Sequence, residues 1–526
     1  AELQALLRIP GQPLVIRKRS LRIVDPNTAE DPAEVPVDLG DGGDVDYSDL
    51  NLSSTGFTVF KKSPDTRVIY VAANGNDNND GLSPSSPVKT PRAGYDKLRH
   101  GYPDWLLFKA GDEFRGNLGT LNKSGRSASE KMLVGVYGEG PRPIIYSPGT
   151  RWAGKQFNTR GSYLAFVGLH LIAEARAEAA RTGNTSKLDS SQWKMSGIGF
   201  LGDAKGILIE DCIIAYFKFG MVFQSNEQNG YLRDIKVRRT AIINSYGHWD
   251  KKIGGHSSGA YIEHVNGLLL EENVWSHNGW NDKISGAQAT KFNHNIYVQS
   301  DSLNCVVRGN VITNGSAHGL QLRPGGIVDD NLFVSNPMAM YVARHESWVR
   351  RNVVLQSDDM GDGPGEDRGF GIQTLPSVHT HFEGNIISQK RGTAEWGDAI
   401  GLIWSRGATE WLDGRPFQVT MKDNHIYNWP RYEGRTSAIN HETPDAKIVE
   451  SKRNYLDTAS GGDNNPPWID PDRDVESYMQ SIGKTPTLDA FIKGAVYRPR
   501  GQWVKEFTAE EVNHYVRRGF DFEVGD

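Results

Sequence analysis

The apolar residues of this chain fall in short runs separated by polar turns, and one phrase recurs at a step of 21 residues. Each copy has a short apolar run, a charged or polar pair, an asparagine and a second apolar pair: residues 304–312, 327–333 and 348–354. Val, Ile and Phe dominate the runs, which favours strands over helices. A repeat of about twenty residues is too short for a helical hairpin repeat but long enough for one coil of strands and turns.

Further copies of the phrase flank these three. Taking the asparagine as marker, the copies sit at Asp211, Thr240, Asn273, Asn310, Asn331, Asn352, Asn385, Asn424 and Asn454, at spacings of 21 to 39 residues. A minimal coil of 21 residues with loops inserted in the longer coils explains this spread. Asparagine tolerates left-handed backbone and forms side-chain ladders, so we expect it to line one recurring turn. The pattern predicts a solenoid rather than a sandwich, which would not repeat one phrase at a fixed phase.

With this repeat, the chain resembles the secreted carbohydrate-active proteins with a right-handed parallel β-helix, the pectate-lyase-like group. Residues 68–84 hold a strand and an Asn/Asp/Gly-rich turn, followed by a helix-like stretch at 93–99 that would cover the open end of an apolar interior. Residues 105–114 then begin the first coil. The resemblance implies an all-β solenoid, and it leaves the reaction open because the group includes lyases, hydrolases, epimerases, esterases and phage depolymerases.

Composition divides the rest of the chain. Residues 1–65, rich in Pro, Asp and Gly, are predicted to form an N-terminal extended arm, and residues 66–100 a cap of one strand and one helix. Residues 101–456 form the predicted parallel β-helix, interrupted by a polar insertion at 174–197. Residues 457–526 leave the repeat and end in a helical pattern at 508–518, which predicts a C-terminal extension or cap.

Charge and cysteine content exclude several classes of protein. A net charge of −5 with a pI near 6.3 shows no basic footprint for nucleic acid, and no apolar run approaches the roughly 20 residues of a membrane span. Cys212 and Cys305 lie about three coils apart, roughly 14 Å, which is too far for a disulfide, so both are predicted to be free buried thiols. The start at Ala1 without Met is consistent with a processed secretory protein or with a sequence trimmed at that residue, and we expect an extracellular or periplasmic location.

Strand alternation predicts one polar face built from two outward columns. The first column is Met221, Tyr261, Tyr297, Gln321, Tyr341 and Gly371, and the second is Phe223, Glu263, Gln299, Arg323, Ala343 and Gln373. Neighbours in a column stand about 4.8 Å apart, a spacing that suits saccharide hydroxyls and carboxylates. The face therefore predicts binding of a polysaccharide, with no prediction for the oligomeric state.

Two histidines precede this face. His294 and His318 occupy equivalent positions just before their strands, so we expect them to stack on adjacent coils. By strand alternation both side chains should point into the core, although strand ends beside inserted loops often break this alternation. Both interpretations stay open: side chains that face the groove, or hydrogen-bonded turn histidines.

The segments 294–297 and 318–323 are similar to the paired His and Arg segments of β-helix uronate epimerases, although Phe292-Asn-His294 stands where those enzymes carry Asp-Pro-His. The resemblance implies His294, His318 and Arg323 as candidates. Such residues suit abstraction of the C5 proton of a uronic acid, since a cation must stabilise the enolate and a base near neutral pKa must take the proton. Tyr297 is the candidate proton donor. Loss of the leaving group gives a lyase, our first hypothesis, and return of the proton gives a C5-epimerase.

Two further hypotheses remain. A glycoside hydrolase would use Glu263 with a loop carboxylate, and a non-catalytic glycan-binding surface protein would use the columns for contact alone. Predicted substrate-binding residues are Tyr261, Gln299, Gln321, Tyr341, Arg344, His345, Lys291 and Trp280. Trp280 belongs to a set of loop tryptophans that offer sugar-stacking surfaces, with Trp249, Trp275, Trp396, Trp404 and Trp411. The acidic loop with Asp358, Asp359 and Asp362 is the candidate Ca²⁺ site.

Overall fold

The computed structural model describes residues 2–7, 15–20, 45–148, 151–154, 161–358, 369–389, 397–403, 412, 414–431, 435–441, 446–462 and 466–521. The chain divides into two units, Ala1–Asp38 and Leu39–Asp526. In the first unit, β1 (Glu2–Leu7) and β2 (Val15–Ser20) pair as an antiparallel hairpin.

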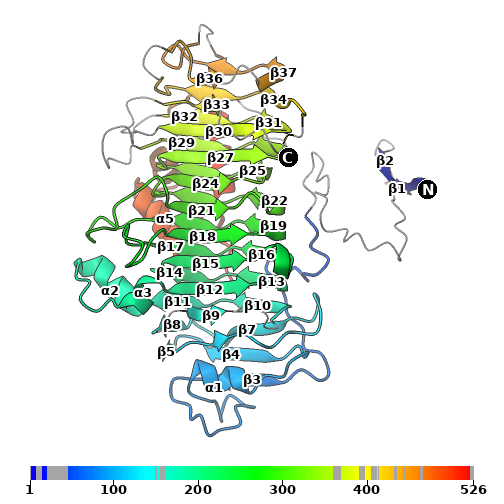
Figure 1. Cartoon of the computed structure of the whole chain (residues 1–526), viewed down its shortest axis with the longest axis vertical. Coiled ribbons are helices and arrows are strands. Elements are labelled where there is room, and N and C mark those ends of the chain that lie inside the picture. The colour runs from blue at the N-terminus through cyan, green and yellow to red at the C-terminus, as the bar shows by residue number, and fades with distance from the viewer. Residues whose placement is uncertain are drawn as a thin grey trace. The chain divides into compact units, whose positions relative to one another are not determined.

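The second unit is a stack of coils, and each complete coil contributes one strand to each of three sheets (Figure 1). The 13-stranded sheet consists of β3 (Val68–Val71), β4 (Trp105–Lys109), β7 (Met132–Tyr137), β10 (Leu164–Val167), β13 (Lys205–Glu210), β16 (Leu232–Arg238), β19 (Val265–Glu271), β22 (Leu303–Arg308), β25 (Gly326–Asp329), β28 (Ser347–Arg350), β31 (His379–Glu383), β34 (Phe417–Lys422) and β37 (Ala446–Lys452).

The other two sheets differ in strand length: most strands of the 12-stranded sheet are short, and most strands of the 11-stranded sheet are longer. The 12-stranded sheet consists of β5 (Glu113–Arg115), β8 (Ile144–Ser147), β11 (His170–Ala173), β14 (Ile213–Ala215), β17 (Ala241–Ile243), β20 (Val274–Ser276), β23 (Val311–Thr313), β26 (Leu332–Val334), β29 (Val353–Leu355), β32 (Ile386–Ser388), β35 (His425–Tyr427) and β38 (Tyr455–Leu456). The 11-stranded sheet consists of β6 (Gly119–Thr120), β9 (Arg151–Gly154), β12 (Ser196–Leu201), β15 (Phe219–Gln224), β18 (Ser258–Glu263), β21 (His294–Val298), β24 (His318–Leu322), β27 (Met338–Arg344), β30 (Phe370–Ser377), β33 (Ile400–Leu402) and β36 (Ile439–His441). Neighbouring strands pair in parallel, as predicted for an all-β parallel β-helix.

An asparagine ladder follows the turn between the 13-stranded and 12-stranded sheets. Each side-chain amide donates to the amide oxygen of the next coil at 2.8–3.1 Å, through Asn273, Asn310, Asn331, Asn352, Asn385, Asn424 and Asn454. The residue before each asparagine has positive φ, for example 53° at Asp330. The ladder was predicted from the repeat, with one correction: Cys212, not Asp211, aligns with Thr240, because Ile213 pairs with Ala241.

The coil interior is a continuous apolar stack. Successive rungs such as Ile296, Leu320 and Met340 are fully buried, and burial of each such side chain stabilises the fold by about 1.5–3 kcal/mol. Both cysteines are buried and free, as predicted.

The N-terminal end of the stack is covered by α1 (Pro91–Asp96), which starts slightly earlier than the helix expected at 93–99. The Thr90 side chain caps it by accepting from the Ala93 N–H at 3.2 Å. A Cβ at Gly94 would lie 2.6 Å from Leu106 Cδ1, so the glycine lets the helix approach the first coil closely. Tyr95 and Leu98 are buried with the core residues of that coil.

Part of the predicted arm is fixed on the solenoid. Within residues 45–65, Asp49 pairs with Lys131 at 2.7 Å and Lys236 at 2.9 Å, and the Tyr47 hydroxyl bonds Glu271 and Arg308. All four partners belong to the 13-stranded sheet or the turn beside it, so this segment lies along that sheet.

The C-terminal residues form α4 (Val475–Ser481), α5 (Leu488–Val496), the 3₁₀ turn η4 (Lys505–Phe507) and α6 (Ala509–Gly519). Another 3₁₀ turn, η2 (Glu227–Asn229), follows β15. Apolar residues of these helices, including Phe491 and Val512, pack with Val274 and Leu332 of the 12-stranded sheet. The helices therefore cover the 12-stranded side of the solenoid. The sequence had predicted an extension or a cap over the end of the solenoid. Among the described residues, no helix combines the length and apolar character needed to cross a membrane.

Candidate functional site

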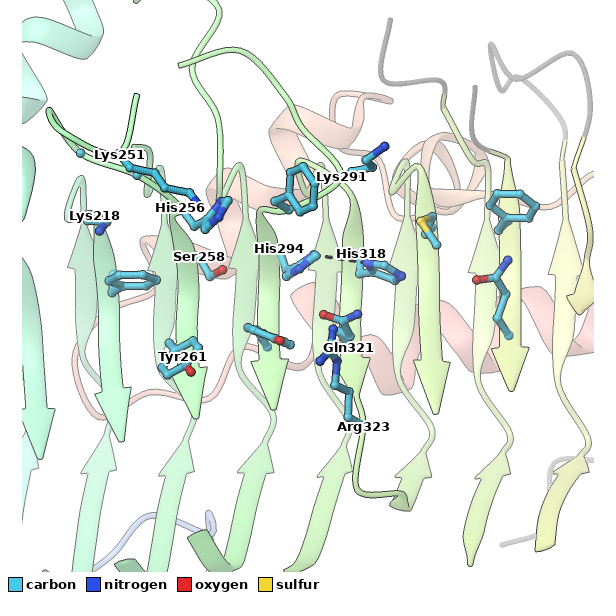
Figure 2. A pocket seen from close by; sticks show the side chains of 18 of the residues that line it. Lys218, Lys251, His256, Ser258, Tyr261, Lys291, His294, His318, Gln321 and Arg323 are labelled. Atoms are coloured by element: carbon cyan, nitrogen blue, oxygen red, sulfur yellow. Dashed lines mark hydrogen bonds between the residues drawn. The ribbon is translucent and has the colours of Figure 1, made fainter. Parts of the chain in front are cut away.

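A cavity of about 900 Å³ lies over the middle of the 11-stranded sheet (Figure 2). Strands β15, β18, β21, β24, β27 and β30 supply its floor, and the loops before β18 and β21 supply its wall. The described residues that line it are Lys218, Phe219, Lys251, Gly254, Gly255, His256, Ser258, Tyr261, Lys291, Phe292, His294, Tyr297, His318, Gln321, Arg323, Met338, Phe370, Gln373, Asp398 and Ile403.

The strand register places the predicted face as successive rungs. One column runs through Val222, Tyr261, Tyr297, Gln321, Tyr341 and Gln373. Four of the six predicted members are thus confirmed. Met221 and Phe223 are fully buried in the core, so Val222 and Gln224 take their places, and Gln373 stands where Gly371 was expected.

His294 and His318 line the cavity floor side by side, which decides between the two interpretations (Figure 2). Their Nδ1 atoms are 3.3 Å apart, and the side chains are only 4% and 6% exposed. The alternation breaks at Asn295, whose side chain bonds Asn278 at 2.9 Å and Asn336 at 3.1 Å inside the coil. Burial holds the pKa of His294 well below its usual range, and the positive charges of His318, Arg323 and His256 lower that pKa further.

Arg323 and Gln321 lie beside the histidines, as Figure 2 shows. The Arg323 guanidinium lies 5.1 Å from the centre of the Tyr297 ring and donates to Gln299 Oε1 at 3.3 Å. Gln321 is 6% exposed, and its Oε1 has no hydrogen-bond partner within the described part of the chain. Burial raises the pKa of the Tyr297 phenol, which the Arg323 charge partly offsets, and raises the pKa of Tyr261 to about 12.

The cavity carries an excess of positive charge. Lys218, Lys251, Lys291 and Arg323 line it, and among the described lining residues Asp398 is the one carboxylate. Asp398 is already engaged, since Arg435 donates to it at 2.6 Å and Asn440 at 2.9 Å. Burial lowers the pKa of Lys218 to about 8, with a further contribution from neighbouring cations. The electrostatics of the cavity therefore favour an anionic ligand.

The wall of the cavity rests on the insertion predicted at 174–197. It forms α2 (Glu174–Thr182) and α3 (Ser190–Trp193), whose apolar residues pack with Tyr246 and Ile284 of the two wall loops. The buried Arg176 donates to backbone carbonyls of three segments, including that of Gln192 at 3.1 Å. A polar insertion in the sequence is thus a support for the site.

Glu263 lies near the cavity without lining it. Its carboxylate accepts from Gln224 Nε2 at 2.6 Å and from the Tyr261 hydroxyl at 3.1 Å. A hydrolase needs two carboxylates on either side of the scissile bond. The described lining residues offer Asp398 alone, which its partners hold, so this arrangement does not favour the hydrolase hypothesis.

Five other predicted ligands lie outside the lining, and one of them, Gln299, contacts the lining residue Arg323 as its hydrogen-bond acceptor. Tyr341 packs its ring 5.6 Å from His318, and Arg344 donates to the Ser300 carbonyl at 3.1 Å. His345 follows the strand end, where its backbone N–H donates to Pro324. Trp280 donates from Nε1 to the Asn314 carbonyl at 2.9 Å, so its indole is tied into the loop.

The other predicted aromatic and metal groups have mixed outcomes. Trp275 is fully buried in the coil interior, so its prediction as a loop residue is wrong. Trp249 is 71% exposed and lines a neighbouring pocket of about 460 Å³. Trp396, Trp404, Trp411, Asp359 and Asp362 lie outside the described residues, which end at Asp358 in the acidic loop, so Ca²⁺ there stays a prediction.

Sequence reasoning missed several lining residues. Ser258 and Phe219 share the rung position of His294, so extending the histidine column would have found them. Lys218 directly precedes that position. His256 and Phe292 come from the wall loops, where no period links sequence position to the direction of a side chain.

Comparison with known proteins bears on the fold. Residues 182–354 match the family model described as "Right handed beta helix region", and no curated protein matches the chain. A GH136 lacto-N-biosidase from Eubacterium ramulus is 14% identical, with 74% of this chain and 67% of that chain covered and a TM-score of 0.40. An alginate lyase from Paenibacillus sp. is 12% identical, with 69% of this chain and 95% of that chain covered and a TM-score of 0.34. The A-module of a mannuronan C-5 epimerase from Azotobacter vinelandii is 12% identical, with 67% of this chain and 87% of that chain covered and a TM-score of 0.36. These scores carry no information on reaction or substrate. The family match and the three parallel sheets together make the chain a right-handed parallel β-helix protein.

Proposed function

We propose that this protein is a polysaccharide lyase that cleaves a uronic-acid-containing glycan by C5 proton abstraction and β-elimination. One observation carries the proposal: His294 and His318 in contact beside Arg323, in a cavity with cationic lining. The glycan carboxylate supplies the negative charge that this lining favours.

Recognition of the uronate begins with its carboxylate. Arg323 directly follows β24, the strand that carries His318 and Gln321, and Arg323 and Gln321 line the same cavity. A guanidinium bound to the carboxylate withdraws charge from the adjacent C5, and it stabilises the enolate that forms when the C5 proton leaves. The same contact therefore binds the substrate and lowers the barrier to its ionisation.

The histidine pair provides the base. Because the two Nδ1 atoms share one hydrogen bond, one ring donates and the other accepts. The lowered pKa keeps His294 neutral near pH 7, so an imidazole with a lone pair is available to accept a proton.

The elimination step is balanced by Tyr297. The C5 proton passes to an imidazole, the C5–H electrons form a C4–C5 double bond, and the C4–O bond breaks with its electrons on oxygen. Tyr297 donates its phenolic proton to that oxygen, and its raised pKa keeps the phenol protonated until then. The imidazolium proton later returns the phenol to its starting state through solvent.

An epimerase shares the first of these steps. If the proton returns to the other face of C5 and the C4–O bond stays intact, the product is the epimer of the substrate unit. Solvent deuterium distinguishes the two, because an epimerase incorporates it at C5 without forming a double bond. Because such polymers stay outside the cytoplasmic membrane, an extracellular or periplasmic location is part of the proposal.

The test is a panel of polyuronates, sulfated glycosaminoglycans and neutral glycans incubated with the purified protein. We expect ultraviolet absorbance from unsaturated uronate ends, matched by new reducing ends, on at least one uronate-containing glycan and on none of the neutral glycans. Reducing ends without that absorbance would establish hydrolysis instead. Binding of a glycan with neither product would leave a glycan-binding protein and overturn the proposal.

A further inference from the structure

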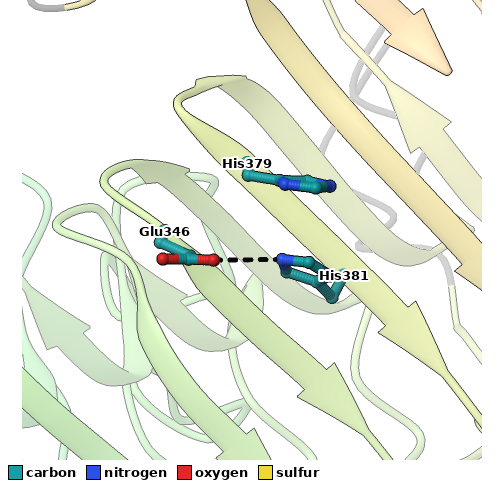
Figure 3. A group of neighbouring side chains, drawn as sticks. All are labelled: Glu346, His379 and His381. Atoms are coloured by element: carbon teal, nitrogen blue, oxygen red, sulfur yellow. Dashed lines mark hydrogen bonds and ion pairs between the residues drawn. The ribbon is translucent and has the colours of Figure 1, made fainter. Parts of the chain in front are cut away.

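A second histidine group lies on the solenoid away from the cavity lining. Glu346 stands in the turn between β27 and β28, and His379 and His381 stand two residues apart on β31 of the next coil (Figure 3). One ligand atom from each of the three lies within 4.8 Å of the others. Two imidazoles and a carboxylate are donors that zinc and neighbouring transition metals prefer.

Neighbouring side chains hold the two imidazoles in place. The His381 ring stacks on Trp348 with centroids 3.7 Å apart and planes at 2°, and it stacks on His379 at 3.8 Å. His379 Nε2 lies 2.9 Å from the Thr420 hydroxyl, and His381 Nε2 lies 3.2 Å from Glu346 Oε1. The Thr420 hydroxyl and the Trp348 indole thus limit the motion of the two rings.

The spacing fits one ion after a small contraction. Three atoms within 4.8 Å of one another have a central point at most about 2.8 Å from each. Zinc binds imidazole nitrogen at about 2.0–2.1 Å, so each atom must move inward by about 0.7 Å. Glu346 is exposed in a turn and can supply most of that movement.

One cation lies on the neighbouring strand. Glu383 of β31 pairs with Lys422 of β34, and the Lys422 ammonium is itself engaged by Glu450 at 2.9 Å.

We propose that Glu346, His379 and His381 form a binding site for one divalent transition-metal ion, with Zn²⁺ as the expected ligand. The ion would join the turn of one coil to a strand of the next and leave a fourth coordination position for water. This site is independent of the proposed lyase chemistry, since none of its three residues lines the cavity. It also differs in ligands and place from the acidic loop at Asp358.

The test is titration of tag-free, chelator-treated protein with ZnCl₂, followed by calorimetry and thermal melting. We expect one ion per chain and a rise in Tm that saturates with the same affinity, because an ion that binds the folded state alone stabilises it. The exposed Glu346→Gln variant and His379→Ala should each weaken binding by at least about tenfold. His514→Ala, which removes a histidine on α6, should bind Zn²⁺ like the parent protein.

The second part of the test is a competition between Zn²⁺ and divalent ions that prefer other ligand atoms. Mg²⁺ and Ca²⁺ favour oxygen ligands, so neither should displace Zn²⁺ at equal concentration. Absence of saturable binding at one ion per chain would overturn the proposal, and so would equal affinity in the parent and both site variants. Because Glu346→Gln changes an exposed carboxylate, it tests the site even if His379→Ala fails to fold.

Discussion

Two rows of side chains run along the same coils, and they differ in how far they repeat. The ladder between the 13-stranded and 12-stranded sheets places asparagine on seven successive coils. The row on the 11-stranded sheet changes at nearly every coil, from Tyr261 and Tyr297 to Gln321, Tyr341 and Gln373. Repetition thus accompanies stacking, and variation accompanies the cavity.

The physical reason lies in what each row contacts. A ladder asparagine donates to the backbone of the previous coil as well as to the next asparagine, as Asn331 does to Val307 and Asn352. Those partners are the same on every coil, so one residue type serves throughout. A cavity side chain meets wall loops of different length and sequence, and its best residue type differs from coil to coil.

The largest expected effect comes from a substitution in the cavity. Arg323→Ala should lower kcat/KM on the cleaved glycan by about 10³-fold, because the enolate loses its cation, while the thermal unfolding transition stays in place. Steady-state kinetics and circular dichroism measure the two quantities. Arg323→Lys keeps the charge without the planar donor pair and should recover part of the loss. Unchanged turnover in Arg323→Ala would move the reaction away from this cavity.

The matching change breaks the ladder. Asn331→Ala removes buried hydrogen bonds to Val307, Asn310 and Asn352 and should lower the free energy of unfolding by about 3 kcal/mol. Urea denaturation measures this loss. Below the melting transition, kcat/KM should match the parent protein, since no ladder residue lines the cavity. A stable variant with lost activity would reverse the division of roles between the rows.

A pH dependence of stability is expected at His425, which directly follows the ladder residue Asn424. Burial lowers the pKa of His425 to about 4, and its ring accepts from Trp468 Nε1 at 2.8 Å. The unfolded chain protonates this ring near pH 6.5 and the folded chain does not, so stability falls as pH drops below about 6.5. From pH 7 to pH 4 the loss is roughly 2 to 3 kcal/mol for this group.

Urea unfolding at several pH values tests that expectation. His425→Gln keeps a hydrogen-bond acceptor without a titrating ring, and it should show a smaller loss of stability between pH 7 and pH 4. The same acid sensitivity in both proteins would assign the loss to other groups.

The smallest expected effect concerns the cavity wall. Lys291→Ala should raise KM a few-fold and reduce the dependence of KM on salt, because an exposed charge attracts the polyanion without touching the reacting atoms. Lys109→Ala, at an exposed position on β4, serves as the control and should change neither value. Equal salt dependence in all three proteins would remove Lys291 from substrate attraction.

The sequence predicts the repeating parts of the molecule best. The 21-residue phrase predicts the coils and ladder because asparagine and apolar pairs recur at fixed phase, and strand alternation predicts Tyr261, Tyr297, Gln321 and Arg323 as cavity residues. Errors begin where repetition ends. The prediction put Met221 in the outward column, whereas its neighbour Val222 pairs with Tyr261 in that column. The direction of the His294 side chain could not be predicted, because it depends on Asn295 turning into the coil.

Long-range contacts set the remaining features. Lys251 and His256 reach the cavity because α2 and α3 support their loop through packing against Tyr246. The group of Glu346, His379 and His381 forms because the turn that carries Glu346 stacks on a coil more than thirty residues later. Neither arrangement has a local sequence signal, since each depends on the lengths of inserted loops.

The most direct test of the central claim compares two ligands that differ in one group. Calorimetry would measure the affinity of a uronate oligosaccharide of the cleaved type and of the same oligosaccharide with its carboxylates reduced to alcohols, using the slow Arg323→Lys variant and the parent protein. The account predicts that carboxyl reduction abolishes measurable binding to the parent protein and that the variant binds the acid form more weakly. Equal affinity for both oligosaccharides would contradict a cavity built to hold a uronate carboxylate.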